Sequence, residues 1–466
     1  MQRKMTCAKK EDTMNFREWK YMKTSFTGVS HTTLNPRGPG VVRIHLVPPK
    51  HPMKEPSVVI LNGQDIIPVN PSWTVLLNQF ITQVNQLPDQ PLAQEDLDRI
   101  VERTISDTCR VFPRTPRETI HKDLETMLRA LMDVAYGRKP ETEIGYLSLG
   151  EYAPSMTAPH RMDLMVSAMT KDGRWHCNQK CLHCYAAGQP EAEVKELTTA
   201  EWKRVIDACK KANIPQLTFT GGEPTLRGDL VELVEYAQWF VTRLNTNGVN
   251  LTADLARALY DASLDSAQIT LYSAEEASHN ILVGAQNHHK TMEGLNNALK
   301  AGLSVSVNTP LCSLNAGEYV KTLEVLRDMG VGYVSCSSLI LTGNAKEKGS
   351  QATQLTEAQL TETLCAAAAF CAENEMELSF TSPGWVKEET LRELGLMVPS
   401  CGACLSNMAV APNGDVVPCQ SWLSDKPLGN LLTDDWKRIW NSPAAATIRN
   451  YSAKMTHECP LKKEGC

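Results

Sequence analysis

Three cysteines stand close together in this 466-residue chain, in the segment Cys177-Asn-Gln-Lys-Cys181-Leu-His-Cys184-Tyr185. At this spacing on one loop, three thiolates can hold three corners of a 4Fe–4S cube. The fourth iron then has no protein ligand from this segment and is open to a substrate or cofactor. The alternative is a zinc site, although zinc sites usually close with four protein ligands at paired Cys-x-x-Cys spacings. The segment therefore favours iron–sulfur chemistry, with zinc as the alternative.

A second segment with chemical potential is Gly221-Gly222-Glu223-Pro224. Paired glycines let a ligand approach the backbone closely, and Glu223 supplies an acceptor for an ammonium group. Alone, this is a weak turn motif. It gains specificity because it comes one strand after the three-cysteine loop.

A second cysteine group closes the chain. Cys401-Gly-Ala-Cys404 precedes two short apolar runs, and Cys419 follows the second of them. Asn413-Gly414 between the runs is a hairpin turn signal, which would bring Cys404 and Cys419 to one end of a ribbon. Cys459 and Cys466 follow a short helix expected near 434–440. Zinc in this ribbon is the alternative to an iron–sulfur cluster.

Strands and helices alternate regularly over residues 161–375, which indicates a parallel sheet, curved or open. The expected strands are 163–168, 216–220, 242–245, 267–271, 303–309 and 331–335. The expected helices are 199–212, 229–240, 252–262, 289–301, 317–329 and 356–374. In such folds chemistry sits at the carboxyl ends of the strands, where the motifs of this region fall.

The N-terminal third follows a different pattern. Residues 1–40 read as a loosely ordered basic lead-in, and 138–160, rich in Gly, Pro, Glu and Ser, as a linker. Between them, strands are expected at 41–47, 57–61 and 65–69, with Asn62-Gly63 as a hairpin turn. Asn70-Pro71 signals the start of three helices, expected near 71–86, 93–110 and 116–136. Residues 41–137 therefore suggest a small winged-helix-like α+β domain.

Charge bears on what this N-terminal domain binds. Residues 41–137 carry ten Lys and Arg against twelve Asp and Glu, the wrong balance for a phosphate-binding face. Capture of an extended peptide by an exposed strand edge fits better. A purely structural role stays open.

The motifs resemble the radical S-adenosylmethionine (SAM) superfamily over roughly 160–345. Its signature is Cys-x-x-x-Cys-x-aromatic-Cys, with His183 at the aromatic position that lies near the adenine and Tyr185 beside the third cysteine. In that family the open iron chelates SAM, and the segment from Gly221 to Pro224 holds the methionine amine. The resemblance also implies SAM contacts for four residues at strand ends: Asn245, Thr246, Asn247 and Ser273. It implies a partial (β/α)6 TIM barrel whose reduced cluster cleaves SAM to a 5′-deoxyadenosyl radical.

The C-terminal pattern, Cys-x9-Gly-x4-Cys with later cysteines, resembles the SPASM and twitch extensions of radical SAM enzymes, which hold auxiliary iron–sulfur clusters. Residues 376–466 would form this small cysteine-rich domain of β-hairpin and helix. A full SPASM extension carries about seven cysteines, whereas this one offers five: Cys401, Cys404, Cys419, Cys459 and Cys466. Five thiols favour one auxiliary 4Fe–4S cluster. Ligation by four would leave no open iron, and ligation by three would let a substrate thiolate bind.

Composition limits the classes of protein. The net charge is −6, no run approaches a membrane span, and no apolar stretch follows the basic start, so we expect a cytoplasmic protein without nucleic-acid or membrane partners. Fifteen cysteines without an export signal favour metal or thiol chemistry over disulfides. Cys312 and Cys336 near strand ends could face a substrate, and the pair His288-His289 reads as solvated. No catalytic acid or base is assigned.

Together these features predict a radical SAM peptide maturase. The N-terminal domain, which resembles the leader-recognition element of peptide-modifying enzymes, would capture the leader of a ribosomally made precursor. A thioether or carbon–carbon cross-link would form in the core peptide, with electrons from a donor such as flavodoxin or ferredoxin. One alternative is oxidation of a residue in a sulfatase-like protein or of a cofactor precursor. Another is a non-catalytic zinc-binding adaptor.

Overall fold

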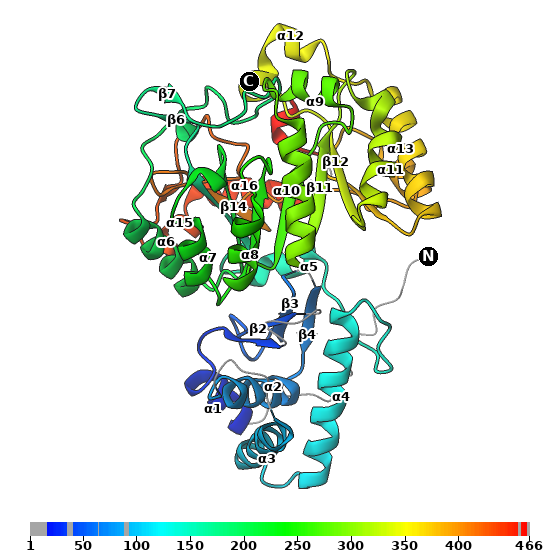
Figure 1. Ribbon diagram of the computed structural model, residues 1–466. Coiled ribbons are helices and arrows are strands. Elements are labelled where there is room, and N and C mark those ends of the chain that lie inside the picture. Colours follow the sequence, from blue (N-terminus) through cyan, green and yellow to red (C-terminus); the bar gives the residue numbers. More distant parts are fainter. Residues whose placement is uncertain (1–15, 35–40, 64, 88–92, 455–457, 464–466) are drawn as a thin grey trace. The chain divides into compact units, whose positions relative to one another are not determined.

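The computed structural model describes residues 16–34, 41–63, 65–87, 93–454 and 458–463 (Figure 1). The chain divides into two compact units, residues 1–157 and 158–466. Each unit has its own sheet. No helix in the described ranges is long and apolar enough to cross a membrane.

The N-terminal unit is a four-stranded antiparallel sheet in the order β1-β2-β3-β4, with three long helices after it. Its elements are α1 (Phe16–Thr24), β1 (Ser30–Leu34), β2 (Val42–Val47), β3 (Ser57–Leu61), β4 (Asp65–Val69), α2 (Pro71–Val84), α3 (Gln94–Val111), α4 (Arg117–Ala135) and α5 (Leu149–Tyr152). The strands and helices expected between 41 and 137 therefore form within a few residues of their expected bounds. Residues 16–34 differ from the expected lead-in, because α1 forms there and β1 pairs with β2.

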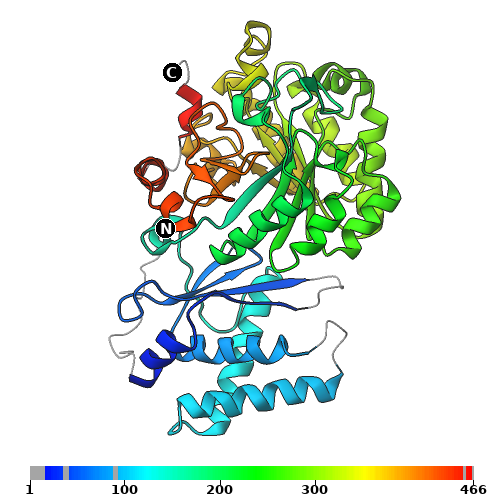
Figure 2. The same cartoon turned by 90° about the vertical axis from the view of Figure 1, so that its left-hand side faces the viewer.

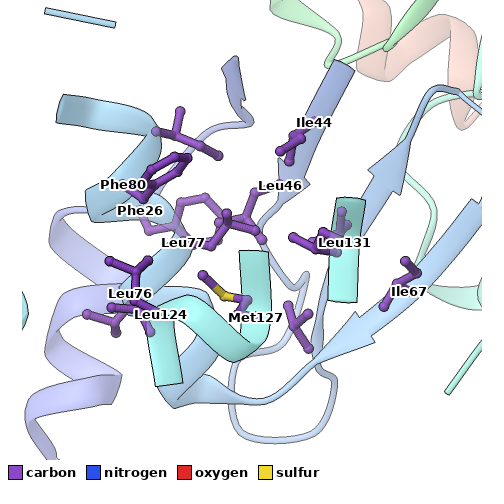
Figure 3. Close-up of a cluster of buried hydrophobic side chains, with 14 of the residues drawn as sticks. Phe26, Ile44, Leu46, Ile67, Leu76, Leu77, Phe80, Leu124, Met127 and Leu131 are labelled. Carbon is purple, nitrogen blue, oxygen red and sulfur yellow. The ribbon is translucent and has the colours of Figure 1, made fainter. Parts of the chain in front are cut away.

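Local chemistry explains the elements of this unit. Asn62 and Gly63 both have positive φ, 50° and 70°, as a tight hairpin between β3 and β4 requires. The Asn70 side chain caps α2 by accepting from the Trp73 amide at 2.8 Å, with Pro71 at the first helical position. Figure 3 shows the core that these elements share, in which side chains of the sheet meet those of α2 and α4. Labelled members include Ile44, Leu46, Ile67, Leu76, Leu77, Phe80, Leu124, Met127 and Leu131.

The C-terminal unit is built on one ten-stranded sheet in the order β13-β12-β11-β10-β9-β8-β5-β14-β15-β16. Its barrel strands are β5 (Arg161–Ser167), β8 (Gln216–Gly221), β9 (Val241–Thr246), β10 (Ser266–Thr270), β11 (Ser304–Pro310), β12 (Tyr333–Ser337) and β13 (Glu377–Phe380), all parallel. The six expected strands are thus present, and β13 adds a seventh. Together they form the partial TIM barrel of an α/β fold.

Helices cover the outer side of this sheet (Figures 1 and 2). They are α6 (Thr199–Lys211), α7 (Leu230–Tyr236), α8 (Ala253–Asp261), α10 (His288–Ala301), α11 (Tyr319–Asp328) and α13 (Glu357–Glu373). The short helices α9 (Glu276–Val283) and α12 (Lys348–Gln351) lie instead at the end of the barrel that holds the three-cysteine loop. Because helices pack on one face of the sheet, burial alternates from residue to residue along the strands. Leu244 and Ile269 are fully buried, whereas their neighbours Asn245 and Gln268 are half-buried on the opposite face.

The C-terminal hairpin extends the barrel sheet. β14 (Asn407–Val410) lies parallel to β5, and β15 (Asp415–Val417) returns antiparallel to it, with Asn413-Gly414 at the turn as expected. The remaining elements are β6 (Thr170–Lys171), β7 (Arg174–Trp175), α14 (Glu388–Glu393), β16 (Gly429–Asn430), α15 (Trp436–Trp440) and α16 (Pro443–Lys454). The hairpin that carries the second cysteine group is therefore continuous with the strand that precedes the first.

Candidate iron–sulfur and cofactor site

The three-cysteine loop follows the β6–β7 hairpin and is held by backbone hydrogen bonds. The Lys180 and Leu182 amides donate to the carbonyls of Val283 and Leu282 at the end of α9, at 2.9 and 2.8 Å. The Trp175 indole donates to the Gln179 carbonyl at 2.8 Å. These bonds fix the loop although it has no regular secondary structure.

The loop gathers its three thiols at the carboxyl end of the sheet. Cys177 Sγ lies 3.4 Å from the Gly222 carbonyl oxygen. Burial raises the pKa of Cys177 to about 12, and the charges of Glu223 and Cys184 add to this effect. Burial likewise raises the pKa of Cys181, with further increments from Cys184 and Cys177. Thiolates that burial disfavours this strongly would be stabilised by cationic iron.

The chemistry of this donor set fits a cube better than it fits one ion. In the described part of the chain, no three His, Cys, Asp or Glu side chains form a group that could hold a single metal ion. In a 4Fe–4S cluster each cysteine binds a different iron, so the sulfurs need not converge on one point.

Residues 343–353 clamp the cysteine loop, and they were not among the predicted site residues. Asn344 donates from its backbone amide to the Cys184 carbonyl at 2.9 Å and from its side chain to the Cys181 carbonyl at 3.1 Å. The Ser350 hydroxyl donates to the Leu182 carbonyl at 3.0 Å. The only sequence signal was an isolated glycine, Gly343, shortly after a strand.

Gly343 allows this clamp to approach. Its φ is +54°, and an added Cβ would collide with the carbonyl oxygens of Cys184 and Tyr185. We expect Gly343→Ala to lower the free energy of unfolding by about 2 kcal/mol, since strain and backbone displacement combine. Urea unfolding of the metal-free chain would measure this. Gly349→Ala is the matched control, because a Cβ there meets nothing within 4 Å; equal losses in the two variants would contradict the prediction.

The Gly-Gly-Glu-Pro segment is organised mainly by contacts within the protein. Gly221 has φ +133°, and a Cβ on Gly221 or Gly222 would strike the carbonyl of Ser167 or Ala168. The paired glycines therefore let the end of β8 pass against the end of β5, and the predicted ligand contact at Gly221 and Gly222 stays a prediction. Pro224 begins a short 3-10 helix, Pro224–Leu226.

Glu223 is buried and joins two strand ends. Its Oε1 accepts from the Thr225 amide and hydroxyl at 3.0 and 2.6 Å and from the Thr246 hydroxyl at 2.6 Å. Its Oε2 accepts from the Asn247 amide at 2.8 Å. Burial raises the pKa of this carboxyl, and the hydrogen bonds oppose that rise. Oε2 keeps lone-pair capacity for a further donor such as an ammonium group.

The other polar residues predicted at strand ends differ in how close they lie to the cysteine loop and in whether they already have partners in the protein. Asn247 belongs to the cysteine loop's surroundings, because its side chain donates to Asn178 Oδ1 at 2.6 Å. Asn245 lies on the half-buried face of β9. Ser273 is fully buried, donates to Glu318 at 2.8 Å and accepts from the Glu275 amide at 3.0 Å. Its hydroxyl thus already has two partners in the protein.

Two buried atoms beside the thiols have no protein partner in the described ranges: His183 Nδ1 and Asn178 Nδ2. The Thr353 hydroxyl donates to the Ser350 carbonyl, so it accepts from His183 Nε2 at 2.7 Å. The proton of His183 is therefore on Nε2, and Nδ1 is a free acceptor. His183 Nδ1 could accept a hydrogen bond and Asn178 Nδ2 could donate one, and such a pair beside three thiols fits a polar cofactor such as SAM. Asn178 was not predicted as a site residue.

The described thiols of the second cysteine group also lie close to one another. The charges of Cys401 and Cys459 raise the pKa of Cys419, whose burial is the main cause of the rise. Burial raises the pKa of Cys404 to about 12, and Cys401 adds to it. Four thiols thus lie near one another, and Cys466 lies outside the described residues.

Arg449 on α16 supplies a positive charge to this group. Its charge lowers the pKa of the Cys404 thiol, against the larger effect of burial. Its guanidinium lies 4.0 Å from the centre of the Trp440 ring and donates to the Trp440 carbonyl at 3.0 Å. Sequence reasoning missed this residue, because Cys404, whose thiol it affects, lies far from it along the chain.

Cys312 and Cys336, the two other thiols predicted to face a substrate, lie in different surroundings. Cys336 packs toward the helices, next to Tyr319 of α11 and Cys371 of α13. Cys312 is fully buried in the cluster that includes Tyr272 and the partly buried Cys181. Of these two cysteines, only Cys312 lies near the three-cysteine loop.

His288 is not solvated as expected. It is half-buried, with its ring centre 5.2 Å from that of His279, and only His289 is exposed. His279 is fully buried on α9 and accepts from the Tyr272 amide at 3.4 Å.

The buried His279 makes stability depend on pH. Burial, with the charge of His288, lowers its pKa from 6.5 to about 3. Between these values the unfolded chain binds a proton that the folded chain does not, so stability falls as pH falls through this range. At pH 5 the loss should be about 2 kcal/mol. Urea midpoints of the metal-free chain at pH 7.5 and 5 should differ less in His279→Gln, whereas the exposed His289→Gln should behave as wild type; an unchanged difference in His279→Gln would sink this prediction.

Comparisons with known proteins agree with this geometry. Residues 176–326 match the Radical SAM superfamily, and residues 401–465 match the SPASM iron–sulfur cluster-binding domain. A probable GTP 3′,8-cyclase of Methanopyrus kandleri is 37% identical over 153 residues, 32% of this chain and 48% of the cyclase. The match thus spans about half of that relative. PqqA peptide cyclase of Bradyrhizobium diazoefficiens is 28% identical over 53% of this chain and 64% of its own.

Among solved structures, Streptococcus suis SuiB bound to precursor peptide SuiA has a similar fold. The TM-score is 0.59 at 13% identity, and the match covers 87% of this chain and 92% of SuiB. Residues 158–466 alone could not supply that coverage, so it includes the N-terminal unit. The radical SAM domain uses SAM and a 4Fe–4S cluster, and the SPASM domain binds auxiliary iron–sulfur clusters.

Proposed function

We propose that this radical SAM enzyme with a SPASM extension modifies a ribosomally synthesised precursor peptide by forming a thioether or carbon–carbon cross-link. The observation that carries the proposal is the N-terminal unit. It adds a sheet with an edge strand to the two cluster-binding regions, and residues 41–137 within it carry ten Lys and Arg against twelve Asp and Glu. The similarity in fold to SuiB, which extends into this unit, supports it.

The first cysteine group would hold the SAM-cleaving cluster through Cys177, Cys181 and Cys184. When bound, this cluster and SAM supply a 5′-deoxyadenosyl radical. Glu223 Oε2 would accept from the methionine amine, and His183 Nδ1 would accept from a donor on the cofactor. Asn178, held by Asn247, would donate to an acceptor on it. Gly221, Gly222 and the 343–353 clamp would keep the loop in place and exclude water.

The second group would hold one auxiliary 4Fe–4S cluster through Cys401, Cys404, Cys419 and Cys459. Four ligands leave no open iron, which favours a role in accepting an electron over binding of a substrate thiolate. Arg449 would stabilise the ligated Cys404 thiolate. The oxygen sensitivity of such clusters suits a reducing cytoplasm, with flavodoxin or ferredoxin as the electron donor.

The outer edge of β1 is the place we propose for the leader. The other edge strand, β4, is already engaged, because the Leu147 amide donates to the Ile66 carbonyl at 2.9 Å. Pro68 on β4 has no amide proton to offer. In the described part of the chain no strand pairs with the outer edge of β1, where the Asn85 side chain donates to the His31 carbonyl at 2.7 Å and a leader would have to replace that bond or pair beside it. An extended leader could add there as a further antiparallel or parallel strand.

A small-molecule substrate is the second candidate, because a probable GTP 3′,8-cyclase matches 153 residues of this chain at 37% identity. Oxidation of a residue in a sulfatase-like protein is the third. The matches to two iron–sulfur families give no support to a zinc-binding adaptor.

Mass spectrometry would separate these candidates. The anaerobic, cluster-loaded chain is incubated with SAM, a reductant and a pool of precursor peptides labelled with deuterium on carbon. Cross-linking predicts deuterium in 5′-deoxyadenosine and a peptide that has lost two hydrogen atoms, at least one of them the transferred deuterium, and does not react with hydrazide. A hydrazide-reactive aldehyde would favour residue oxidation, and deuterium-free 5′-deoxyadenosine with every peptide would contradict a peptide substrate.

A further inference from the structure

A buried glutamine links the segment after the first cysteine group to the segment after Cys419. Gln189 is 5% exposed. Its side-chain amide donates to the carbonyl of Tyr185 and to that of Ser421, the latter at 3.3 Å. Its Oε1 accepts from the Leu423 amide at 3.3 Å. One side chain therefore binds both segments with every polar atom it has available.

Apolar packing joins the same two segments. Met165, Met169 and Ala186 form one buried cluster with Val417 and Leu423, and Cys177, Cys184 and Tyr185 pack against it. A second backbone bond runs from the Glu191 amide to the Leu423 carbonyl at 3.2 Å.

We propose that Gln189 is a positioning residue that joins the two cysteine groups into one ordered unit, so that a cluster bound at either group stabilises the other. The proposal depends on the assignment of cluster ligands above and is independent of the substrate. Coupling of this kind is reciprocal: if the first cluster strengthens the second, the second strengthens the first by the same factor.

The chemistry of the side chain explains why glutamine is needed. Only a primary amide can donate to two carbonyls and accept from an amide at once. Glutamate could accept from Leu423 but would face the carbonyls of Tyr185 and Ser421 with a negative charge. Alanine would leave all three backbone groups without this partner.

Hydrogen exchange of the metal-free chain tests the positioning directly. In Gln189→Ala and Gln189→Glu the Leu423 amide should exchange at least about tenfold faster than in wild type, since local opening there becomes easier. Gln359→Ala is the matched control: Gln359 makes only capping contacts on α13 and should leave this amide unchanged. Wild-type exchange in Gln189→Ala would overturn the proposal, and wild-type exchange in Gln189→Glu would show that the donated bonds are dispensable, which also overturns it.

Iron release tests the coupling. In Cys181→Ala the auxiliary iron should be lost to a chelator about tenfold faster than in wild type, and this difference should disappear when Gln189→Ala is present in both backgrounds. Circular dichroism would confirm that each variant is folded. Equal release from wild type and Cys181→Ala, or an undiminished difference in the Gln189→Ala background, would overturn the proposal. Neither readout uses catalytic activity, so a wrong peptide assignment would not affect the result.

Discussion

Replacing Cys181 by alanine should abolish formation of 5′-deoxyadenosine, a fall of at least about 100-fold, because the cluster that we propose at this loop would lose one of its three ligands. Cys181 is the middle thiol of the loop, and the Leu182 carbonyl and the Cys181 carbonyl are both held by the 343–353 clamp. Alanine keeps those backbone bonds, so the loop should retain its path while one corner of the cube has no ligand. Anaerobic assays of SAM cleavage with dithionite would measure the loss.

The control is the same substitution at an exposed cysteine. Cys365→Ala on α13 should cleave SAM as wild type does. Iron analysis extends the test: the triple alanine variant of Cys177, Cys181 and Cys184 should fall from about eight irons per chain to about four, the content of one 4Fe–4S cluster. If Cys181→Ala still cleaved SAM, this loop would not be the one that holds the SAM-cleaving cluster. A fall from about four irons to none would remove the auxiliary cluster.

Local patterns predicted most of the fold because each of them is decided by nearby residues. Alternating strands and helices in the barrel were placed within a few residues, and Asn62-Gly63, Asn70 and Asn413-Gly414 formed the turns and the cap that their side chains favour. β13 was not predicted, because Glu377–Phe380 is only four residues long. The sequence of residues 16–34 does not predict β1, because this strand is polar and depends on pairing with β2.

The candidate site could be predicted where its residues are close along the chain. The spacing of Cys177, Cys181 and Cys184 is visible in the sequence, whereas the clamp at 343–353 meets the loop only through folding. Arg449 and Gln189 were not predicted for the same reason, since Cys404 and Ser421, which they approach, lie far from them in sequence. The sequence predicts a ligand at the paired glycines, but it does not show that β5 and β8 also converge at Gly221.

Thr33→Pro in β1 should raise the KM for a modified precursor about tenfold, while SAM cleavage without peptide stays at its wild-type rate. The His31 carbonyl accepts from the Asn85 side chain at 2.7 Å, away from β2. Alternate residues of a strand direct their backbone groups to the same side, so those of Thr33 point to the outer edge as well. Proline removes the amide proton there and is tolerated on an edge strand. Loss of one or two hydrogen bonds to a leader costs about 1–2 kcal/mol, which corresponds to that change in KM.

Thr33→Val separates the backbone from the side chain. Valine keeps the amide proton but loses the hydroxyl that accepts from Arg43 at 3.0 Å, so it should bind the precursor as wild type does. A core peptide without its leader should react equally poorly with both variants and with wild type, because remote binding energy is then absent from every reaction. If Thr33→Pro folds, by circular dichroism and thermal unfolding, and still binds the full precursor with wild-type KM, the leader does not add to β1. The engaged edge at β4, from which residue 147 would have to be displaced, would then be the place to look.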